Sequence, residues 1–171
     1  MKVFLFCVLS IALVACNNGT SSDASIEQIQ SLESNKSLSR SDSLIKTYVR
    51  FVDANPKHDS AVVYLFKAAQ LNVRTNKVTP GARLYERVAL EYKEDPHAPE
   101  ALIRGGVALA SMNDAANAKR LYDWFIKDYP THPRIEEVKM WSETSGLSEE
   151  ELMKRFQDII QKAKDSTRNT Q

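Results

Sequence analysis

The residues of this chain that could bind a metal are three histidines, His58, His97 and His132. Zinc needs its nitrogen ligands about 2 Å from one point. Each histidine comes one or two residues after a proline, and these prolines separate segments with a helical pattern of apolar residues. Equivalent positions in neighbouring helices are about 10 Å apart. We therefore expect the histidines to be polar residues of interhelix turns, and we predict no metal and no cofactor.

Ser43 and Lys46 match the Ser-x-x-Lys nucleophile motif of penicillin-recognising enzymes. Those enzymes also need the strings Ser-Asp-Asn and Lys-Thr-Gly, and neither occurs in this sequence. The glycine-rich phosphate loop and the His-Glu-x-x-His zinc motif are missing from the sequence too. The match at Ser43 is therefore interpreted as chance, and the sequence predicts a protein without catalytic residues.

Cys16 has the clearest predicted chemistry, which is attachment of a lipid to its thiol. Lys2 is followed by 13 mostly apolar residues at positions 3–15, a pattern typical of a secretory signal. The string Leu-Val-Ala-Cys that ends at Cys16 resembles a bacterial lipobox, in which the chain is cut before the cysteine and the thiol receives a diacylglycerol. An uncleaved membrane anchor is the alternative, but a spanning helix needs about 20 residues. Residues 1–15 are therefore predicted to be a lipoprotein signal peptide.

The charge balance and the cysteines limit the kinds of partner and of cross-link. The chain has 23 Lys and Arg against 22 Asp and Glu, and removal of Lys2 with the signal leaves the mature form near neutrality. Nucleic-acid-binding proteins usually show a basic excess or stripe, so no nucleic acid is expected as a partner. Cys7 lies in the signal and Cys16 is predicted to be acylated, so no disulfide is expected in the mature chain.

A tether is predicted between the lipid and the folded body. Residues 17–23 are polar and turn-prone, and a capping box then predicts a short helix over about 25–35. The apolar side chains of that helix are expected to pack against the body rather than to form a coiled coil, which needs three or four heptads. The predicted organisation is a signal at 1–15, a tether with a short helix at 16–40, a repeat domain at 41–164 and a disordered tail at 165–171.

From residue 41 onwards the apolar periodicity is that of helices, which predicts an all-α fold. Pro56, Pro96 and Pro130 each end an apolar-periodic stretch. The last two are 34 residues apart and the first two are 40 apart. Self-similarity at such a period indicates a helical solenoid, here a short one of about six or seven antiparallel helices.

Residues 99–132 carry the most specific motif. The order Leu-x2-Gly-Gly-x2-Leu from Leu102, followed by Ala-x3-Tyr-x2-Phe-x4-Pro from Ala118, resembles the tetratricopeptide repeat. In that family the small residues lie where the two helices of a pair approach, and the aromatic residues fill the space toward the next pair. The predicted repeat-packing residues are Gly105, Gly106, Ala118, Tyr122, Phe125 and Pro130.

The preceding repeat is less regular. Residues 59–71 align with the first helix of the better repeat, which places Phe66 in the position of Gly106. The six extra residues between the first two prolines are expected in a longer loop over 72–79, with Thr79 as the cap of the next helix.

The last helix is predicted from a capping box at Ser148–Glu151 and from apolar residues that follow it about one helical turn apart, so that they form a stripe along one side. The stripe is expected to be a lid over the exposed end of the solenoid, because solenoid ends need capping. A partner-binding face is the alternative. The stripe consists of Leu152, Phe156, Ile159, Ile160 and Ala163.

The lipobox and the repeat together resemble the small tetratricopeptide lipoproteins of Gram-negative envelopes, a group that includes the D subunit of the outer-membrane β-barrel assembly machinery and the coordinator associated with the Tol–Pal system. The resemblance implies a periplasm-facing scaffold, lipid-anchored in the outer membrane, that holds another envelope protein or peptide segment. An accessory module that binds peptidoglycan or a small ligand is the alternative. The family's groove positions fall on Ser60, Val63, Lys67, Gln70, Leu71, Glu100, Ile103, Val107, Ala110 and Ser111.

Overall fold

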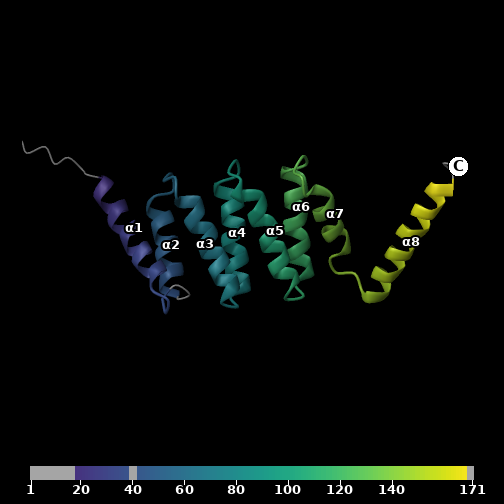
Figure 1. Cartoon of the computed structure of the whole chain (residues 1–171), viewed down its shortest axis with the longest axis horizontal. Coiled ribbons are helices and arrows are strands. Elements are labelled where there is room, and N and C mark those ends of the chain that lie inside the picture. The colour runs from purple at the N-terminus through teal and green to yellow at the C-terminus, as the bar shows by residue number, and fades with distance from the viewer. Residues whose placement is uncertain (1–17, 39–41, 169–171) are drawn as a thin grey trace, which may run out of the picture.

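The computed structural model describes residues 18–38 and 42–168, and within these ranges it contains eight α-helices and no strand (Figure 1). The predicted signal at 1–15, Cys16 and Asn17 lie outside the described residues. The helices are α1 (Asn18–Ser34), α2 (Asp42–Ala54), α3 (Ala61–Arg74), α4 (Val78–Glu91), α5 (His97–Ala110), α6 (Ala115–Asp128), α7 (Ile135–Thr144) and α8 (Glu149–Arg168).

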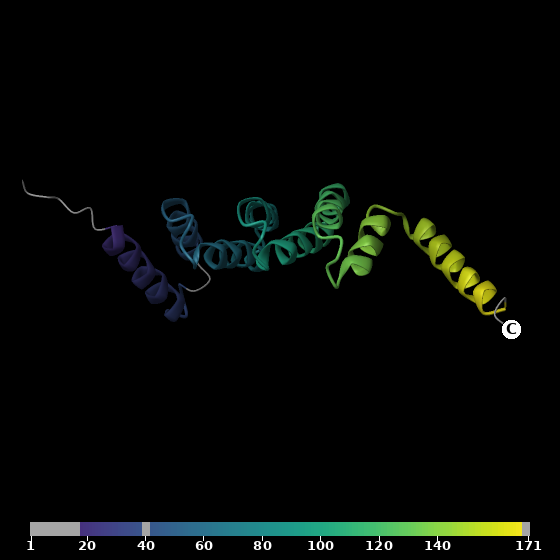
Figure 2. The same cartoon turned by 90° about the horizontal axis from the view of Figure 1, so that it is seen from above.

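The helices from α1 to α7 stack side by side in the order of the sequence and run in alternating directions (Figure 1). Figure 2 shows α2, α4 and α6 on one side of the stack and α3 and α5 on the other. The helices α3 and α5 also contact each other, as expected of equivalent helices in adjacent pairs. The prediction of a short all-α solenoid is confirmed, and the predicted repeat domain contains seven helices, α2 to α8.

The repeat has a period of 37 residues, so the prediction of 34 from the prolines is wrong. Tyr48, Tyr85 and Tyr122 are each 37 residues apart and are all buried. The same main-chain hydrogen bond closes the second helix of each pair, from Asn55 to Phe51, from Tyr92 to Val88 and from Tyr129 to Phe125.

The prolines predict the wrong register for the repeat because they occupy two different kinds of position relative to the helices. Pro56 and Pro130 follow the end of α2 and of α6, whereas Pro96 is the N-cap residue of α5. Both positions suit a residue that has no N–H to donate. With the correct register, Ala69 rather than Phe66 is equivalent to Gly106, so both pairs have a small residue at this position.

The turn within each pair is short, and this corrects the longer loop expected over 72–79. The helix α3 continues to Arg74 and α4 begins at Val78, with Lys77 rather than Thr79 as its N-cap residue. Asn76 and Asn113 adopt positive φ angles of 62° and 59° in the turns after α3 and α5. Asparagine tolerates this left-handed conformation better than most residues, so it ends a helix well.

The helix α1 is part of the body. It begins at Asn18, so residues 18–23 are helical and not the flexible tether that the sequence predicts there; residue 17 lies outside the described residues. Ile29 is fully buried in the same core cluster as residues of α2 and α3. Glu33 accepts hydrogen bonds from the Tyr48 hydroxyl at 2.6 Å and from Lys67 Nζ at 2.7 Å. The expected packing of this helix on the body is therefore found in the structure.

The Glu33 contacts make the docking of α1 sensitive to pH. Burial raises the pKa of the Glu33 carboxyl, but the hydrogen bonds from Lys67 and Tyr48 outweigh burial and leave the pKa below its usual value. The carboxylate therefore stabilises the fold above the pKa of an unfolded glutamate, about 4.3. This contribution is lost as the pH falls through the lower pKa of the folded state.

We expect Glu33→Gln to lower the free energy of unfolding by about 1–2 kcal/mol at pH 7, because two hydrogen bonds to a carboxylate are weakened. At pH 3, below the pKa of an unfolded glutamate, the difference from the unsubstituted protein should be smaller than at pH 7, because the stabilisation supplied by the Glu33 carboxylate is lost as the pH falls. Urea unfolding at the two pH values measures both quantities. Glu27→Gln, on the exposed side of α1, is the matched control, and an equal loss in that variant at pH 7 would contradict the role given to Glu33.

The helix α8 does not cover the end of the solenoid, so the lid prediction is wrong. It projects from the end of the stack beyond α7 (Figure 1). Phe156, Ile159 and Ile160 are each about half exposed, at 47 %, 51 % and 55 %. The capping box is present, with the Ser148 hydroxyl and Glu151 hydrogen-bonded to each other's main-chain N–H. The helix continues to Arg168, which also corrects most of the disordered tail predicted at 165–171.

Candidate functional site

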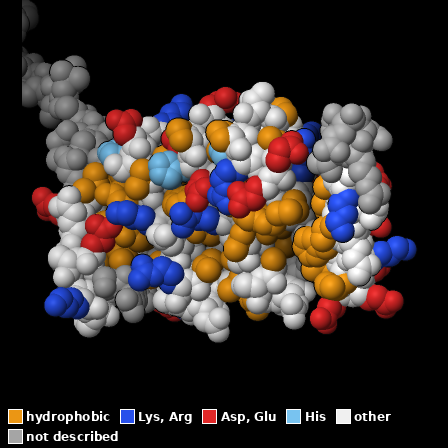
Figure 3. Space-filling view, turned by 45° about the vertical axis from the view of Figure 1, so that its right-hand side comes forward, with side chains coloured by type: hydrophobic (Ala, Val, Ile, Leu, Met, Phe, Trp, Pro, Cys, Tyr) orange, Lys and Arg blue, Asp and Glu red, His pale blue; other side chains and the backbone are white. Residues whose placement is uncertain are grey.

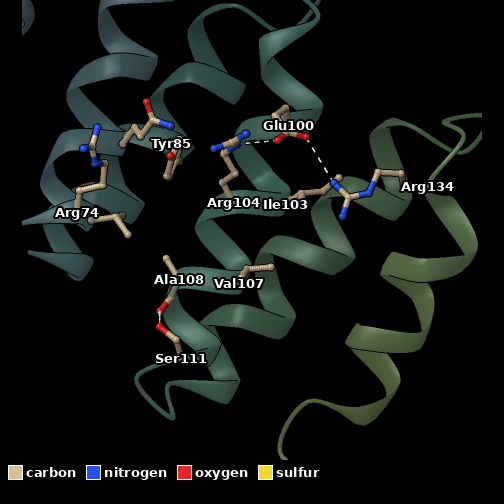
Figure 4. A pocket seen from close by; sticks show the side chains of 11 residues that line it. Arg74, Tyr85, Glu100, Ile103, Arg104, Val107, Ala108, Ser111 and Arg134 are labelled. Atoms are coloured by element: carbon tan, nitrogen blue, oxygen red, sulfur yellow. Dashed lines mark hydrogen bonds and ion pairs between the residues drawn. The ribbon is translucent and has the colours of Figure 1, made fainter. Parts of the chain in front are cut away.

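A groove runs along α3, α5 and α7, and its larger cavity has a volume of about 440 Å³ (Figure 4). Ile103 forms part of its floor and is almost fully buried, whereas Val107 is 45 % exposed at its wall. Val73 from α3 and Tyr85 from α4 complete the apolar lining. Such a surface offers apolar contact area that water covers when no partner is bound.

Three arginines from successive pairs line this cavity, Arg74, Arg104 and Arg134 (Figure 4). Glu100 accepts a hydrogen bond from Arg104 Nε at 2.6 Å, and its other oxygen lies 3.5 Å from a terminal nitrogen of Arg134. The guanidinium of Arg74 has no ion pair within the described residues. The Glu100 carboxylate thus contacts two of the three guanidinium groups, and Glu137 pairs with Arg134 as well. With three guanidinium groups against two carboxylates, the rim of the groove has an excess of positive charge.

The two paired arginines are also fixed by aromatic rings. The Arg104 guanidinium lies 5.5 Å from the ring centre of Phe66, and that of Arg134 lies 5.3 Å from Trp141. Arg134 also donates a hydrogen bond to Glu137 at 2.7 Å, which lowers the pKa of the Glu137 carboxyl. These contacts hold the guanidinium planes of Arg104 and Arg134 in place.

A second cavity of about 430 Å³ continues the groove between α5, α6 and α7. Val107 lines both cavities, and Ala110, Tyr122 and Trp141 line the second. The Tyr122 and Trp141 rings pack against each other with their centres 5.7 Å apart. Figure 3 shows the hydrophobic side chains in the middle of this face beside a cluster of basic and acidic ones. We call the two cavities together the concave groove.

The structure brings six of the ten predicted groove residues to these two cavities. Ile103 and Val107 lie at the centre as described, and the others are Gln70, Glu100, Ala110 and Ser111. Lys67 and Leu71 line a smaller cavity beside α2, where Leu71 is buried and Lys67 is paired with Glu33.

The remaining two predicted residues have structural contacts instead. Val63 packs against the core cluster formed by residues of α1 to α5. Ser60 donates its main-chain N–H to His58 Nδ1 at 3.1 Å, in the turn before α3. Neither residue lines the concave groove.

Sequence reasoning missed the three rim arginines together with Val73 and Trp141. The 37-residue spacing of the tyrosines was the available signal, because it would have aligned Val73 with Ala110 and Arg74 with Ser111. Arg134 could not be found in this way, because it precedes α7 in the turn after the last complete pair.

The predicted repeat-packing residues lie within or beside the second half of the core. A Cβ atom on Gly106 would lie 2.3 Å from the Tyr122 ring, and one on Gly105 would lie 2.8 Å from Leu121. Ala118 and Phe125 are fully buried. Only Pro130 is exposed, in the turn between α6 and α7.

The three histidines lie in separate turns, and no group of residues suited to a metal ion occurs within the described part of the chain. His132 Nδ1 accepts the main-chain N–H of Arg134 at 3.2 Å, as His58 does for Ser60. In the middle repeat Asp95 takes this role and accepts the N–H of His97 at 2.8 Å. His58 and His132 thus close interhelix turns, and His97 belongs to a turn that Asp95 closes.

No protein-family model matches this chain, and no curated protein is detectably similar to it. Among the described helices, none has both the length and the apolar composition needed to cross a bilayer.

Proposed function

We propose that this protein is a non-enzymatic scaffold that holds a segment of another envelope protein in the concave groove. The observation that carries the proposal is the continuous apolar floor around Val107, bordered by the three rim arginines. Helical solenoids use such faces to bind extended peptides or partner helices. The excess of arginine over carboxylate at the rim favours a partner segment that carries acidic residues beside apolar ones.

The proposal places the protein in the bacterial outer membrane, facing the periplasm, with its lipid on Cys16. The support for this location is the sequence at the N-terminus and the resemblance to tetratricopeptide lipoproteins. The assembly of outer-membrane proteins is the process that this resemblance suggests.

The location is tested by Cys16→Ala in cells. Without the thiol no thioether can form, so we expect the variant to lose the fatty-acid labelling that the unsubstituted protein shows. Density fractionation of the unsubstituted protein separates outer from inner membrane. Equal fatty-acid labelling of the variant would count against acylation at this position.

The groove is tested with a photoreactive amino acid at Val107, and at Leu90 as the matched control. Leu90 is apolar and 72 % exposed, but it lies on α4 and outside the groove. We expect a discrete protein adduct from position 107 that is weaker by about tenfold with Arg74→Glu, since one charge contact is reversed. Equal adducts from both positions would contradict a partner in the groove.

A second candidate function is supported by the size and charge of the larger cavity. A volume of about 440 Å³ falls in the range of small-ligand sites, and convergent arginines suit an anionic group. An accessory module that binds peptidoglycan or a small ligand would therefore use the same residues. Retention on purified peptidoglycan that Arg104→Ala abolishes, without a protein adduct at position 107, would favour this alternative.

A further inference from the structure

The helix α8 presents an apolar stripe that no other described helix covers. Met153, Phe156, Ile159 and Ile160 are between 47 % and 56 % exposed and lie one turn apart along one side of the helix. Figure 3 shows these hydrophobic side chains along the helix at the right-hand end of the molecule. Exposed apolar side chains that form one continuous stripe usually mark an interaction surface.

The charges around this stripe have a regular arrangement. At about 100° per residue, Arg155 and Lys162 fall at one border of the stripe and Lys164 falls at the other. Asp158 and Asp165 fall on the opposite side of the helix. Over this length of the helix the stripe thus has basic residues at both borders, and its acidic residues are turned away from it.

This arrangement argues against a second copy of the chain as the occupant. Antiparallel pairing of two α8 stripes would bring Arg155 of one copy toward Lys162 of the other, and like charges at such borders are unfavourable. Parallel pairing in register would place Lys162 of one copy near Lys164 of the other. The one acidic partner that Arg155 has in the structure is Glu143 of its own chain, on α7.

The concave groove is an equally poor partner for α8. Its rim carries Arg74, Arg104 and Arg134, so folding α8 onto it would again place basic residues against basic residues. A partner that fits α8 is therefore apolar where it meets the stripe and negatively charged where it meets the basic residues at the borders.

We propose that α8 binds the surface of a phospholipid bilayer, with its stripe among the acyl chains and its border residues at the headgroup phosphates. A helix that is apolar on one side and basic at the borders lies in the plane of the interface. The long side chains of Arg155, Lys162 and Lys164 can reach the phosphates while their methylene groups stay beside the apolar region. Asp158 and Asp165 then face water.

This contact goes beyond the proposed function and does not depend on the acyl chain. The helices α1 and α8 lie at opposite ends of the solenoid (Figure 1). Lipid binding by α8 would thus add a second attachment, at the opposite end of the solenoid from α1.

The experiment uses a chain that starts at residue 16 with Cys16→Ala, which keeps every described residue and cannot be acylated. Flotation with vesicles of phosphatidylcholine alone, and with vesicles that also contain phosphatidylglycerol, measures partition. We expect binding to both, stronger with phosphatidylglycerol at low salt. Phe156→Asn combined with Ile159→Asn should lower partition by at least about tenfold, because two apolar side chains are removed from the acyl region.

Gln161→Asn, on the side of α8 away from the stripe, is the matched control and should float like the unsubstituted chain. Circular dichroism shows whether the helix persists in each variant. The proposal is overturned if the chain without stripe substitutions floats with neither kind of vesicle. It is also overturned if the stripe variant floats as well as that chain. A dimer in vesicle-free solution that the stripe variant dissociates overturns it too, since a second copy is then the occupant. Failure of acylation in cells leaves all these results unchanged, so the two proposals fail separately.

Discussion

Replacing Phe125 with alanine should lower the free energy of unfolding by about 3–5 kcal/mol, the range typical of a deleted core aromatic ring. Phe125 is fully buried in the core cluster of the second half of the molecule. Its ring centre lies 5.1 Å from that of His132 and 5.8 Å from that of Tyr129. Both neighbours belong to the turn that joins α6 to α7, so the cavity would weaken the contact between successive pairs as well as the pair itself.

Chemical denaturation followed by tryptophan fluorescence measures this loss, because Trp124 and Trp141 pack against the same cluster. Phe156→Ala is the matched control, since it makes the same chemical change at a half-exposed position on α8. We expect that control to change stability by less than about 0.5 kcal/mol. Similar losses in the two variants would mean that Phe125 does not occupy a closed core.

Replacing Gly106 with valine should cost about 2–3 kcal/mol through overpacking. A Cβ atom at this position would lie 2.3 Å from one carbon of the Tyr122 ring and 2.8 Å from a second. The ring is almost fully buried and packs against Trp141 on α7, so it cannot swing away without disturbing the next helix. The gain in helix propensity on losing a glycine, below about 1 kcal/mol, does not offset this.

Ala110→Val is the control for Gly106→Val, because it adds a β-branched side chain to an exposed position on the same helix. Propensity alone predicts a loss of about 0.5 kcal/mol there. Tyr122→Leu in the Gly106→Val background should recover part of the loss, and a double-mutant cycle measures that coupling. Additive effects of the two substitutions would show that the ring and the glycine do not meet.

The repeat was detected from the sequence, but its helices were aligned with one another at the wrong positions. Proline was used to set the period, but it appears at the start of a helix in Pro96 and after the end of one in Pro130. The buried tyrosines of α2, α4 and α6 set the register correctly, because they occupy equivalent buried positions in three successive pairs. Despite this error, three of the four groove residues predicted on α5 line the larger cavity: Glu100, Ile103 and Val107.

The amino-acid sequence by itself determined that the fold is all-helical and which small and aromatic residues pack the best-matched pair, because both follow from the pattern of residues over a few turns of the chain. Several helix ends were predicted wrongly, since α1 begins at Asn18, α3 continues to Arg74 and α4 begins at Val78. Only the tertiary structure decided which amphipathic helix is covered. The helices α1 and α8 have similar apolar spacing, yet Ile29 is fully buried and Ile159 is half exposed. The difference comes from partners distant in sequence: Tyr48 and Lys67 both hydrogen-bond to Glu33 on α1, whereas Arg155 has only a surface pair with Glu143 to hold α8. The concave groove was decided in the same way, because its arginines come from three separate repeats and meet only when the helices stack at a fixed step.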